Sequence, residues 1–313
     1  MDVVPHPLPH PSAHGRPPSA ATLRWIEECL GTGSRVKLVR PLVGGAAHVN
    51  HALLVESRAG TAHRLVLRRW ARRGWNLTDL EFSPEREIAA LALLAGCGIA
   101  TPSLVAADPS GAYCDAPTLL ISRLPGHAPR PAVGDLPEYL IQLAAALLSV
   151  HALEGAPTMP PYTPYNRLIL QSPPRHATRP GLWEQAFEIV SGSPPEAAPH
   201  FIHRDYEPDN TLWSSGRLTG IVDWDRASYG PIAVDVAHMR CKLALRYGIA
   251  AADRFLADVD QVRGGYEHDP YWDLRCVIDL LPGGRSPIDE TGVPLLEGYL
   301  EALLAQFGVP VHH

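Results

Sequence analysis

Two aspartates and one asparagine in the second half of the chain have the residue types and the spacing that phosphoryl transfer uses. Asn210 lies five residues after Asp205, and Asp223 follows thirteen residues after Asn210. Phosphoryl transfer needs a carboxylate that accepts a hydroxyl proton, and oxygen ligands that hold Mg²⁺ against the nucleotide phosphates. Hard cations prefer carboxylate and amide oxygens. These three side chains can therefore supply all the roles that the reaction requires.

Apolar segments on both sides of the polar stretch 203–210 predict how it is held. Phe201-Ile202 is a short strand-like step before it, and residues 211–213 and 218–222 read as the two strands of a hairpin after it. Such a hairpin brings Asp223 beside the loop. Each polar residue taken singly is equally well explained as a turn residue, but the whole set in this strand context favours a site.

The same segment resembles the aminoglycoside phosphotransferase and choline kinase family, which are small-molecule kinases with a protein-kinase-like fold. The family signature is His-x-Asp, an Asn five residues after the Asp, and then Ile or Val before Asp-Trp. The chain has these at His203, Asp205, Asn210 and Asp223. The resemblance implies that Asp205 is the catalytic base, that Asn210 and Asp223 are magnesium ligands, and that His203 braces the loop. Asp235 resembles the downstream aspartate that anchors the loop from the following helix.

Three short strand patterns in the first half, at 36–39, 51–56 and 64–68, predict an antiparallel sheet. Gly44 and Gly45 lie between the first two. Adjacent glycines let backbone amides approach phosphates, although a plain hairpin turn explains them as well. The family has its nucleotide-covering loop at this place, so the resemblance implies that Gly44 and Gly45 contact the nucleotide.

The third strand departs from the protein-kinase pattern, because Arg68 and Arg69 follow Leu67 where those enzymes and the antibiotic kinases closest to them have a Lys. Arginine binds phosphate through two parallel hydrogen bonds. Several branches of the family resemble this chain in having Leu-Arg here, so the resemblance implies that Arg68 takes the phosphate-binding role, with Glu87, in a helix expected at 85–94, as its ion-pair partner. The alternatives are solvated arginines at a strand end and an ordinary acidic residue in a first helical turn.

Residues 117–124 resemble the strand and hinge of the family, where the backbone from Ile121 to Arg123 is expected to bind the purine base. Any buried strand fits this pattern equally well. Beyond residue 124 the apolar residues recur at helical spacing. We therefore expect helices at 136–153, 181–191, 233–246, 249–263, 271–281 and 293–307. Residues 155–180 form a proline-rich insert, either a substrate lid or a simple loop.

These segments predict an α+β, protein-kinase-like fold with two lobes. The lobe 21–123 has an antiparallel sheet that binds the nucleotide, with a hinge near 121–125. The lobe 124–313 is larger, mostly helical, and carries the catalytic loop 203–210 and the substrate site. Residues 1–20, rich in proline and histidine and without an apolar stripe, are expected to form a flexible tail.

Composition agrees with an enzyme of this kind. The 313 residues are 46% apolar and 19% charged, enough for two separate cores. A net charge of −6 without a basic face argues against nucleic acid as a partner. Five scattered cysteines without a Cys-x-x-Cys pair indicate free thiols in a reducing compartment. No apolar run suits a membrane span or a signal peptide, so we expect a cytoplasmic protein with no membrane contact and no obligate protein partner.

The expected activity is transfer of the γ-phosphate of ATP or GTP, with Mg²⁺, to a hydroxyl of a small polar molecule, above all an aminoglycoside or another antibiotic. Carboxylates near the acceptor attract amino groups, and aromatic rings pack on sugars or cations. Each candidate is also explained as a solvated or core residue. The candidates are Asp225, Tyr206, Glu207, Tyr271 and Asp273, with Asp209, Trp272 and Asp279 completing the set.

Three alternatives remain open at the level of sequence. The first is a small-metabolite kinase acting on an amino alcohol, a sugar or an amino acid. The second is a nucleotide-binding pseudokinase, suggested by Arg68 in place of Lys and opposed by the intact Asp205, Asn210 and Asp223. The third is a metal-dependent hydrolase, which lacks further ligands at suitable spacing. The sequence does not choose between ATP and GTP or indicate the oligomeric state.

Overall fold

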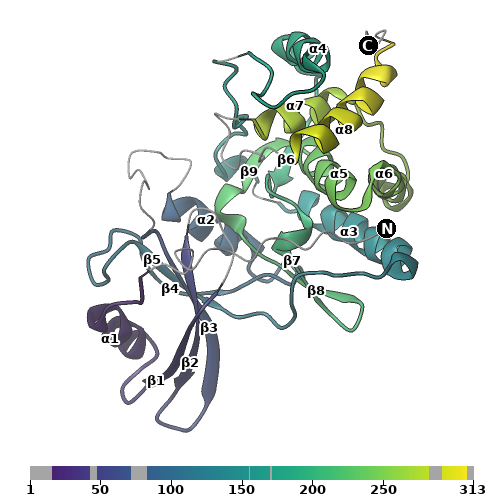
Figure 1. Ribbon diagram of the computed structural model, residues 1–313. Helices are drawn as coiled ribbons and strands as arrows, with labels where there is room; N and C mark the ends of the chain where they lie inside the picture. Colours follow the sequence, from purple (N-terminus) through teal and green to yellow (C-terminus); the bar gives the residue numbers. More distant parts are fainter. Residues whose placement is uncertain are drawn as a thin grey trace. The chain divides into compact units, whose positions relative to one another are not determined.

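A computed structural model describes residues 16–42, 48–71, 83–154, 156–169, 171–281 and 291–308. The chain forms two compact units (Figure 1). Unit 1 comprises residues 1–95 and 101–124, and unit 2 comprises residues 96–100 and 125–313. The chain passes from unit 1 to unit 2 after Leu124, which lies within the segment 121–125 where the sequence placed a hinge.

Unit 1 is built on a five-stranded antiparallel sheet with the strand order β1-β2-β3-β5-β4. The strands are β1 (Arg35–Pro41), β2 (Val49–Glu56), β3 (Ala62–Arg69), β4 (Leu104–Asp108) and β5 (Thr118–Ser122). The expected strands at 36–39, 51–56 and 64–68 are confirmed as β1 to β3. Helix α2 (Pro84–Leu94) confirms the helix expected at 85–94.

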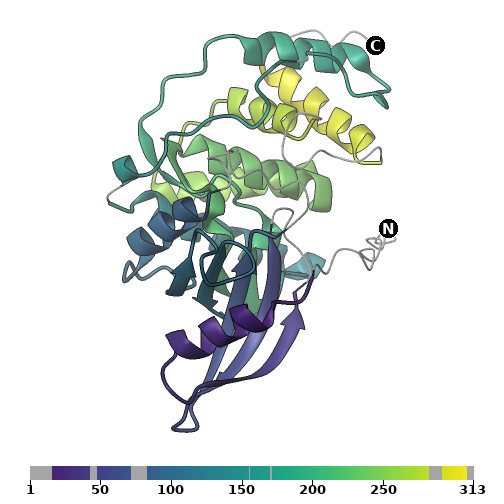
Figure 2. The same cartoon turned by 90° about the vertical axis from the view of Figure 1, so that its left-hand side faces the viewer.

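Helix α1 (Ala20–Cys29) was not expected from the sequence, and it covers part of this sheet, as Figure 2 shows in purple. The side chain of Ser19 caps it by accepting the N–H of Thr22 at 3.1 Å. Trp25 and Ile26 are buried from the helix side, in one cluster with residues of β2, β3 and β5. Leu23, Ile26 and Leu30 recur at helical spacing and pack on or in this cluster, so the helix was predictable from the sequence.

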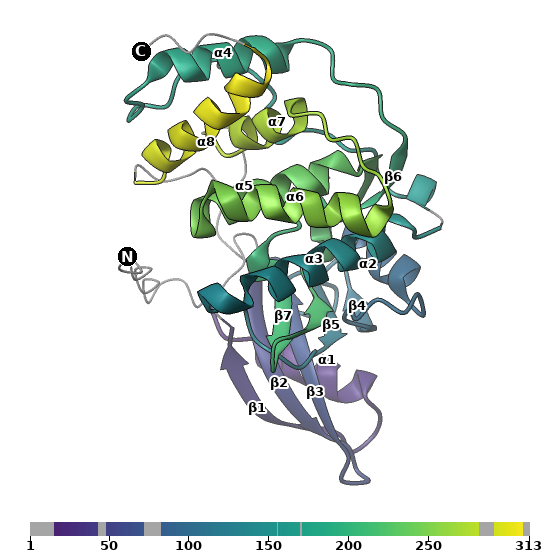
Figure 3. The same ribbon diagram turned by 90° about the vertical axis from the view of Figure 1, so that its right-hand side faces the viewer.

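Unit 2 is mostly helical, as expected. It contains α3 (Leu136–His151), α4 (Pro180–Ser191), α5 (Ala233–Tyr247), α6 (Ile249–Arg263), α7 (Tyr271–Asp279) and α8 (Val293–Gln306). Figure 3 shows α3, α6 and α5 side by side, and the packing of α6 on both neighbours agrees. The main core lies between α4, α5, α7 and α8, with Trp183, Leu274 and Leu300 at its centre.

Two small antiparallel pairs in unit 2 hold the polar stretch 203–210. Strand β6 (Pro199–Ile202) precedes the stretch and pairs with β9 (Ser228–Pro231). Strands β7 (Thr211–Ser214) and β8 (Arg217–Ile221) follow it and form the expected hairpin. Short 3₁₀ turns lie at Pro208–Asn210 and Trp224–Arg226. The loop is therefore fixed at both ends by strands.

The proline-rich insert is partly built into unit 2. The N–H of Tyr162 donates to Tyr229 O and the N–H of Tyr229 donates to Pro160 O, both at 2.8 Å. The N–H of Asn166 donates to Asp279 Oδ1 at 2.9 Å. Gly230 permits this packing, because a Cβ on it would lie 2.5 Å from Cβ of Tyr162. Residues 160–166 are thus attached to β9 and α7.

One helical stretch in the described part of the chain, Val133–His151, is long and apolar enough to cross a membrane by length and composition alone. It consists of α3 and the turn before it. Leu140, Leu143 and Leu147 of this helix are buried within unit 2, where α3 packs on α6. Since core helices of soluble proteins meet the same criterion, the stretch is weak evidence for a membrane span.

Candidate functional site

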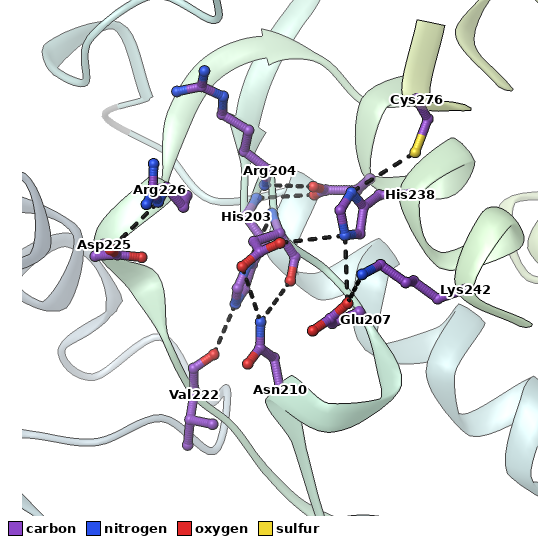
Figure 4. Close-up of polar contacts among 12 residues, drawn as sticks. His203, Arg204, Glu207, Asn210, Val222, Asp225, Arg226, His238, Lys242 and Cys276 are labelled. Carbon is purple, nitrogen blue, oxygen red and sulfur yellow. Dashed lines mark hydrogen bonds and ion pairs between the residues drawn. The ribbon is translucent and has the colours of Figure 1, made fainter. Parts of the chain in front are cut away.

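Asp235, in the first turn of α5, fixes the start of the polar loop. Its Oδ2 accepts the N–H of His203 at 2.9 Å and its Oδ1 accepts the N–H of Arg204 at 2.6 Å. Figure 4 labels the two donor residues. The Nε2 of His151, at the end of α3, lies 3.0 Å from the same Oδ2. Asp235 is completely buried, and these three donors compensate the burial of its charge. The anchoring position expected for Asp235 is confirmed by these contacts.

Two non-glycine residues at the ends of the site have left-handed backbone conformations. Arg204 has φ of 67° and Asp223 has φ of 70°. Such conformations cost on the order of 1–3 kcal/mol each and cluster where function requires a particular side-chain direction. The hydrogen bond from Arg204 N to Asp235 helps to hold the first of them.

The side chain of His203 joins the loop to the segment that carries Asp223. Its Nε2 donates to Val222 O at 3.0 Å, and its Nδ1 accepts the N–H of Asp205 at 3.3 Å. The N–H of Val222 in turn donates to Asn210 O at 2.9 Å. Both backbone groups of Val222 thus bind the loop, and Asp223 is the next residue in the chain. This is the bracing contact that the sequence predicted for His203.

Asn210 is oriented by Asp205. Its Nδ2 donates to the backbone oxygen of Asp205 at 2.8 Å and lies 3.4 Å from Asp205 Oδ2. Because the amide nitrogen is used in this way, Oδ1 is the atom that can act as a cation ligand. Asn210 and Asp223 therefore offer oxygen donors on two segments that Val222 holds together, which suits a hard divalent cation.

The carboxylate of Asp205 lies in a charged cluster with Glu207 and with His238 and Lys242 of α5. Figure 4 labels these last three residues. His238 Nε2 is 3.2 Å from Asp205 Oδ1 and 3.6 Å from Glu207 Oε2. Lys242, one helical turn further on, places Nζ 2.6 Å from Glu207 Oε2. Asp205 keeps about 30% of its side chain exposed. The cluster thus presents a partly accessible carboxylate whose charge is balanced from the helix.

The charges in this cluster shift the pKa values in opposite directions. Burial lowers the pKa of His238, but its interactions with Asp205 and Glu207 outweigh burial and raise the pKa to about 9. Burial likewise raises the pKa of Asp205, and the contact with His238, helped by the charge of Lys242, outweighs it and holds the pKa below its ordinary value. At neutral pH Asp205 is therefore ionised and faces an imidazolium.

In unit 1, the expected ion pair between Arg68 and Glu87 is confirmed. Arg68 Nε lies 2.7 Å from Glu87 Oε2, and the side chains are 7% and 2% exposed. Arg69 is also buried and its guanidinium donates to Asp115 at 2.6 Å, so the alternative of solvated arginines is wrong for both residues. Gly44 and Gly45 lie outside the described residues.

The backbone around Ile121 and Arg123 is largely used by the sheet of unit 1. Ile121 lies in β5 between Val66 of β3 and Leu104 of β4. The N–H of Ser122 donates to Ser103 O at 2.9 Å, and the N–H of Arg123 donates to Arg64 O at 3.1 Å. These two N–H groups are thus used within unit 1, and the purine-binding role of the backbone from Ile121 to Arg123 stays a prediction that would rest on its other backbone groups.

Most of the residues suggested for acceptor binding are buried in unit 2. Tyr206 is completely buried and its hydroxyl donates to Leu143 O at 3.0 Å. Asp273 is also completely buried and pairs with Arg240. These two residues have structural roles, so the expectation that their side chains contact the acceptor is wrong.

The other acceptor candidates differ in exposure. Asp225 is 2% exposed with Arg226 Nε at 3.3 Å, and Tyr271 is 8% exposed at the start of α7. Both side chains are largely withdrawn from solvent. Glu207 remains partly exposed, close to Asp205.

A small cavity next to Asp205 was not predicted as a unit. Its enclosed space is about 10 Å³, room for about one water molecule. The residues that line it come from the insert, the loop, α5 and α7; they are Tyr162, Tyr165, Arg204, Val234, His238, Trp272, Arg275, Cys276 and Asp279. Trp272 and Asp279 were among the sequence candidates. The others had no spacing signal, because four separate segments supply them.

Comparison with known proteins agrees with the predicted fold. Residues 39–274 match the family model described as a phosphotransferase enzyme family. No curated protein has a matching sequence. Among solved structures, a thermostable variant of an aminoglycoside phosphotransferase, APH(4)-Ia, in ternary complex with ADP and hygromycin B is 14% identical, with a TM-score of 0.63 over 93% of this chain and 100% of that chain.

Two further solved structures are similar. A macrolide 2′-phosphotransferase of type I is 17% identical, with a TM-score of 0.56 over 92% of this chain and 97% of that one. An amicoumacin kinase in complex with AMP-PNP and Ca²⁺ is 13% identical, with a TM-score of 0.56 over 92% and 94%. At these identities the likeness shows a shared fold, and the predicted kinase-like fold class is confirmed.

Proposed function

Because the chain belongs to the phosphotransferase enzyme family, we propose that it is a kinase that transfers the γ-phosphoryl group of ATP or GTP to a hydroxyl of a small polar molecule. The main support is the arrangement around Val222, whose N–H binds Asn210 O and whose carbonyl binds His203 Nε2. These contacts join the segment that ends at Asp223 to the loop that carries Asp205 and Asn210, and these three side chains are of the types that phosphoryl transfer requires.

Each residue has a role in this proposal. Asp205, ionised at neutral pH, accepts or orients the proton of the acceptor hydroxyl. Asn210 and Asp223 hold Mg²⁺, which when bound neutralises charge on the nucleotide phosphates. In unit 1, Arg68 binds the phosphates and the buried Glu87 fixes its guanidinium. Gly44 and Gly45 remain predicted nucleotide contacts.

The acceptor class rests on two observations. The similar enzymes bear names or ligands of aminoglycoside, macrolide and amicoumacin type, so a hydroxylated antibiotic is the first class to test. A small-metabolite kinase is the second candidate, because Glu207 beside Asp205 is already balanced by Lys242 and His238 and offers little to a polycationic aminoglycoside. The intact set of Asp205, Asn210 and Asp223 opposes a pseudokinase.

The function is tested by nucleoside diphosphate release from Mg-ATP and Mg-GTP across aminoglycosides, macrolides, other hydroxylated antibiotics, amino alcohols, sugars and amino acids. Asp205→Ala serves as the blank. We expect release that one acceptor class stimulates and that the blank lacks. Nucleotide binding without stimulated release across the whole panel, or equal release by the blank, would contradict the proposal.

The metal assignment is tested by nucleotide affinity. Asp223→Ala should weaken binding of the nucleotide about tenfold or more in the presence of Mg²⁺ and leave it unchanged in EDTA, because the residue acts through the metal. Asp209→Ala is the matched control, since Asp209 lies on the same loop and pairs with Arg246 at 2.8 Å. Equal Mg²⁺-dependent affinity in the Asp223 variant and the control would remove Asp223 from the ligand set.

A further inference from the structure

The side chain of Arg204, the residue directly before Asp205, is held by the proline-rich insert. Its guanidinium lies 4.3 Å from the ring centre of Tyr165 and 5.5 Å from that of Tyr162, and it donates to Thr163 O. Arg204 is 1% exposed. A planar guanidinium stacks on aromatic rings and keeps its charge and its hydrogen bonds as it does so. The insert therefore fixes the side chain that precedes the carboxylate of the loop.

The insert is itself attached to other elements of unit 2. Tyr162 donates its N–H to the carbonyl oxygen of Tyr229, in β9, at 2.8 Å. Asn166 donates its N–H to Oδ1 of Asp279, in α7, at 2.9 Å. Tyr165 lies between these two attached residues, so its place does not depend on Arg204 alone. The contact between the two therefore restrains the loop.

The ring of Tyr165 also contacts a second arginine. The guanidinium of Arg226 lies 5.6 Å from its centre. Arg226 is 1% exposed and ends the 3₁₀ turn Trp224–Arg226, which begins directly after Asp223. One ring thus touches an arginine from the loop of Asp205 and an arginine from the segment of Asp223.

The backbone of both segments needs such support. Arg204 has φ of 67° and Asp223 has φ of 70°, both in the left-handed region. The cost of such a conformation is of the same order as a buried contact between a guanidinium and a ring. Because Arg204 precedes Asp205 directly, a change in its backbone would redirect the carboxylate.

The ring of Tyr165, and not its hydroxyl, makes these contacts. The hydroxyl oxygen is buried and has no hydrogen-bond partner within the described part of the chain. Burial raises the pKa of Tyr165, so the hydroxyl is neutral at physiological pH. Phenylalanine can therefore replace the tyrosine in this role, whereas an aliphatic residue cannot.

We propose that Tyr165 is a positioning residue, which sets the direction of Asp205 through the guanidinium of Arg204. The insert then supports the catalytic loop, instead of covering a substrate or merely connecting two helices. The proposal rests on the proposed function for the role of Asp205. The contacts of Tyr165 belong to unit 2 alone and can be tested without an acceptor, so the two proposals can fail separately.

The first test reads the place of Asp205 from its neighbour His238, whose Nε2 lies 3.2 Å from Asp205 Oδ1. The other groups that face this imidazole are Glu207, at 3.6 Å, the charge of Lys242, and Cys276, whose Sγ lies 3.8 Å from Nδ1. NMR titration of the imidazole, assigned by comparison with the spectrum of His238→Gln, measures its pKa, which is about 9 in the wild type.

Three variants interpret this pKa. Tyr165→Leu should lower the pKa of His238 by about one pH unit, because a carboxylate leaves close contact with the imidazolium. Tyr165→Phe keeps the ring and should retain the wild-type value. Phe187→Leu is the control for loss of an aromatic ring, since Phe187 is buried in the main core of unit 2, on α4; it should also retain the value.

An unchanged pKa of His238 in Tyr165→Leu would overturn the proposal. An equal fall in Tyr165→Phe or in Phe187→Leu would also overturn it, because the effect would then not come from this ring. If Tyr165→Leu does not fold, Tyr165→Met takes its place, since methionine adapts to irregular space without supplying a ring.

The second test is catalytic and uses Mg-ATP with the acceptor of the panel above that gives the wild type the fastest diphosphate release. Tyr165→Leu should lower kcat about ten- to a hundredfold and leave the KM for the acceptor within about twofold, because a misplaced group costs rate and not binding. Tyr165→Phe should restore kcat.

The split between kcat and KM distinguishes this role from a substrate lid. A raised KM for the acceptor with an unchanged kcat would mean that the ring binds substrate, and would overturn the proposal. Absence of stimulated release in the wild type, together with a lowered pKa of His238 in Tyr165→Leu, would count against the proposed function and leave the positioning of Asp205 by Tyr165 supported.

Discussion

Two aspartates in unit 2 each have a histidine partner, and the two pairs differ in charge. Asp235 lies in the core with His151 Nε2 at 3.0 Å, whereas Asp205 is about 30% exposed with His238 Nε2 at 3.2 Å. Burial is the largest influence on His151 and lowers its pKa, while two carboxylates raise the pKa of His238 to about 9. The histidine is thus a neutral hydrogen-bonding partner in one pair and the cation of an ion pair in the other.

The difference between the pairs shows what separates a structural carboxylate from a reactive one. Both oxygens of Asp235 are used by fixed donors, among them the N–H groups of His203 and Arg204. Asp205 instead keeps an accessible surface beside a cavity, with a cation on one side and Asn210 on the other. Accessibility and the charge of the partner, not the residue type, mark Asp205 as the group that meets an acceptor.

The largest expected effect comes from exchanging each carboxylate for an amide. Asp205→Asn should lower turnover about 10²–10⁴-fold, the usual contribution of a general base. It should lower the free energy of unfolding by only about 1 kcal/mol, because the pair with His238 is partly exposed and His238 keeps Glu207 as a partner. Asp235→Asn should instead lower the free energy of unfolding by about 3 kcal/mol, because it leaves buried donors without an acceptor. Chemical denaturation and diphosphate release on the same preparations measure both quantities.

Two results would contradict this difference between a catalytic Asp205 and a structural Asp235. One is a large loss of stability in Asp205→Asn, and the other is a fully stable Asp235→Asn. Asp209→Asn controls for the loss of a loop carboxylate, since Asp209 is exposed and its partner Arg246 lies on the surface side of α5 with 31% of its side chain exposed.

The loop could be predicted from the sequence and the cavity could not. The reason is that the residues of the loop are close together in the sequence, whereas those of the cavity are far apart. His203, Asp205, Asn210 and Asp223 lie within twenty-one residues, between two short strands that fix them. Their spacing therefore encodes their geometry. Arg275 is more than sixty residues from the loop, and only the packing of α7 on α5 brings it to the cavity.

Burial explains the errors among the polar residues. Tyr206 and Asp273 have types that suit substrate binding, yet each finds an internal partner, Leu143 O and Arg240 respectively. Polar residues of this kind are stable inside a protein only when paired, and a pair separated by tens of residues leaves no local pattern. The ion pair of Arg68 with Glu87 was predictable because the family resemblance supplied the partner.

A smaller effect is expected from the charge of His238. Its pKa is raised from 6.5 to about 9, so its contribution to stability is fully present below pH 6.5 and is lost as the pH rises through 9. The difference in free energy of unfolding between the wild type and His238→Gln should therefore shrink between pH 6.5 and 9.5. Denaturation curves in EDTA at each pH measure it, and a constant difference would show that His238 is neutral in the folded protein.

The smallest effect, and the one that sharpens the comparison most, is expected at His151. Its pKa is lowered by burial, so the imidazole is neutral in both the folded and the unfolded state above pH 6.5, and its contribution to stability does not change there. Below pH 6.5 the unfolded state binds a proton that the folded state does not, and the contribution is lost.

The difference in free energy of unfolding between the wild type and His151→Gln should accordingly be flat from pH 6.5 to 9.5, where that for His238→Gln declines. It should fall below pH 6.5, by at most about 1.4 kcal/mol per pH unit. Glutamine keeps a donor for Asp235, so the variant is expected to fold. A decline above pH 6.5 at His151 would mean that this histidine is charged in the core. Then Asp235 would carry the same kind of ion pair as Asp205, and exposure alone would distinguish the reactive carboxylate.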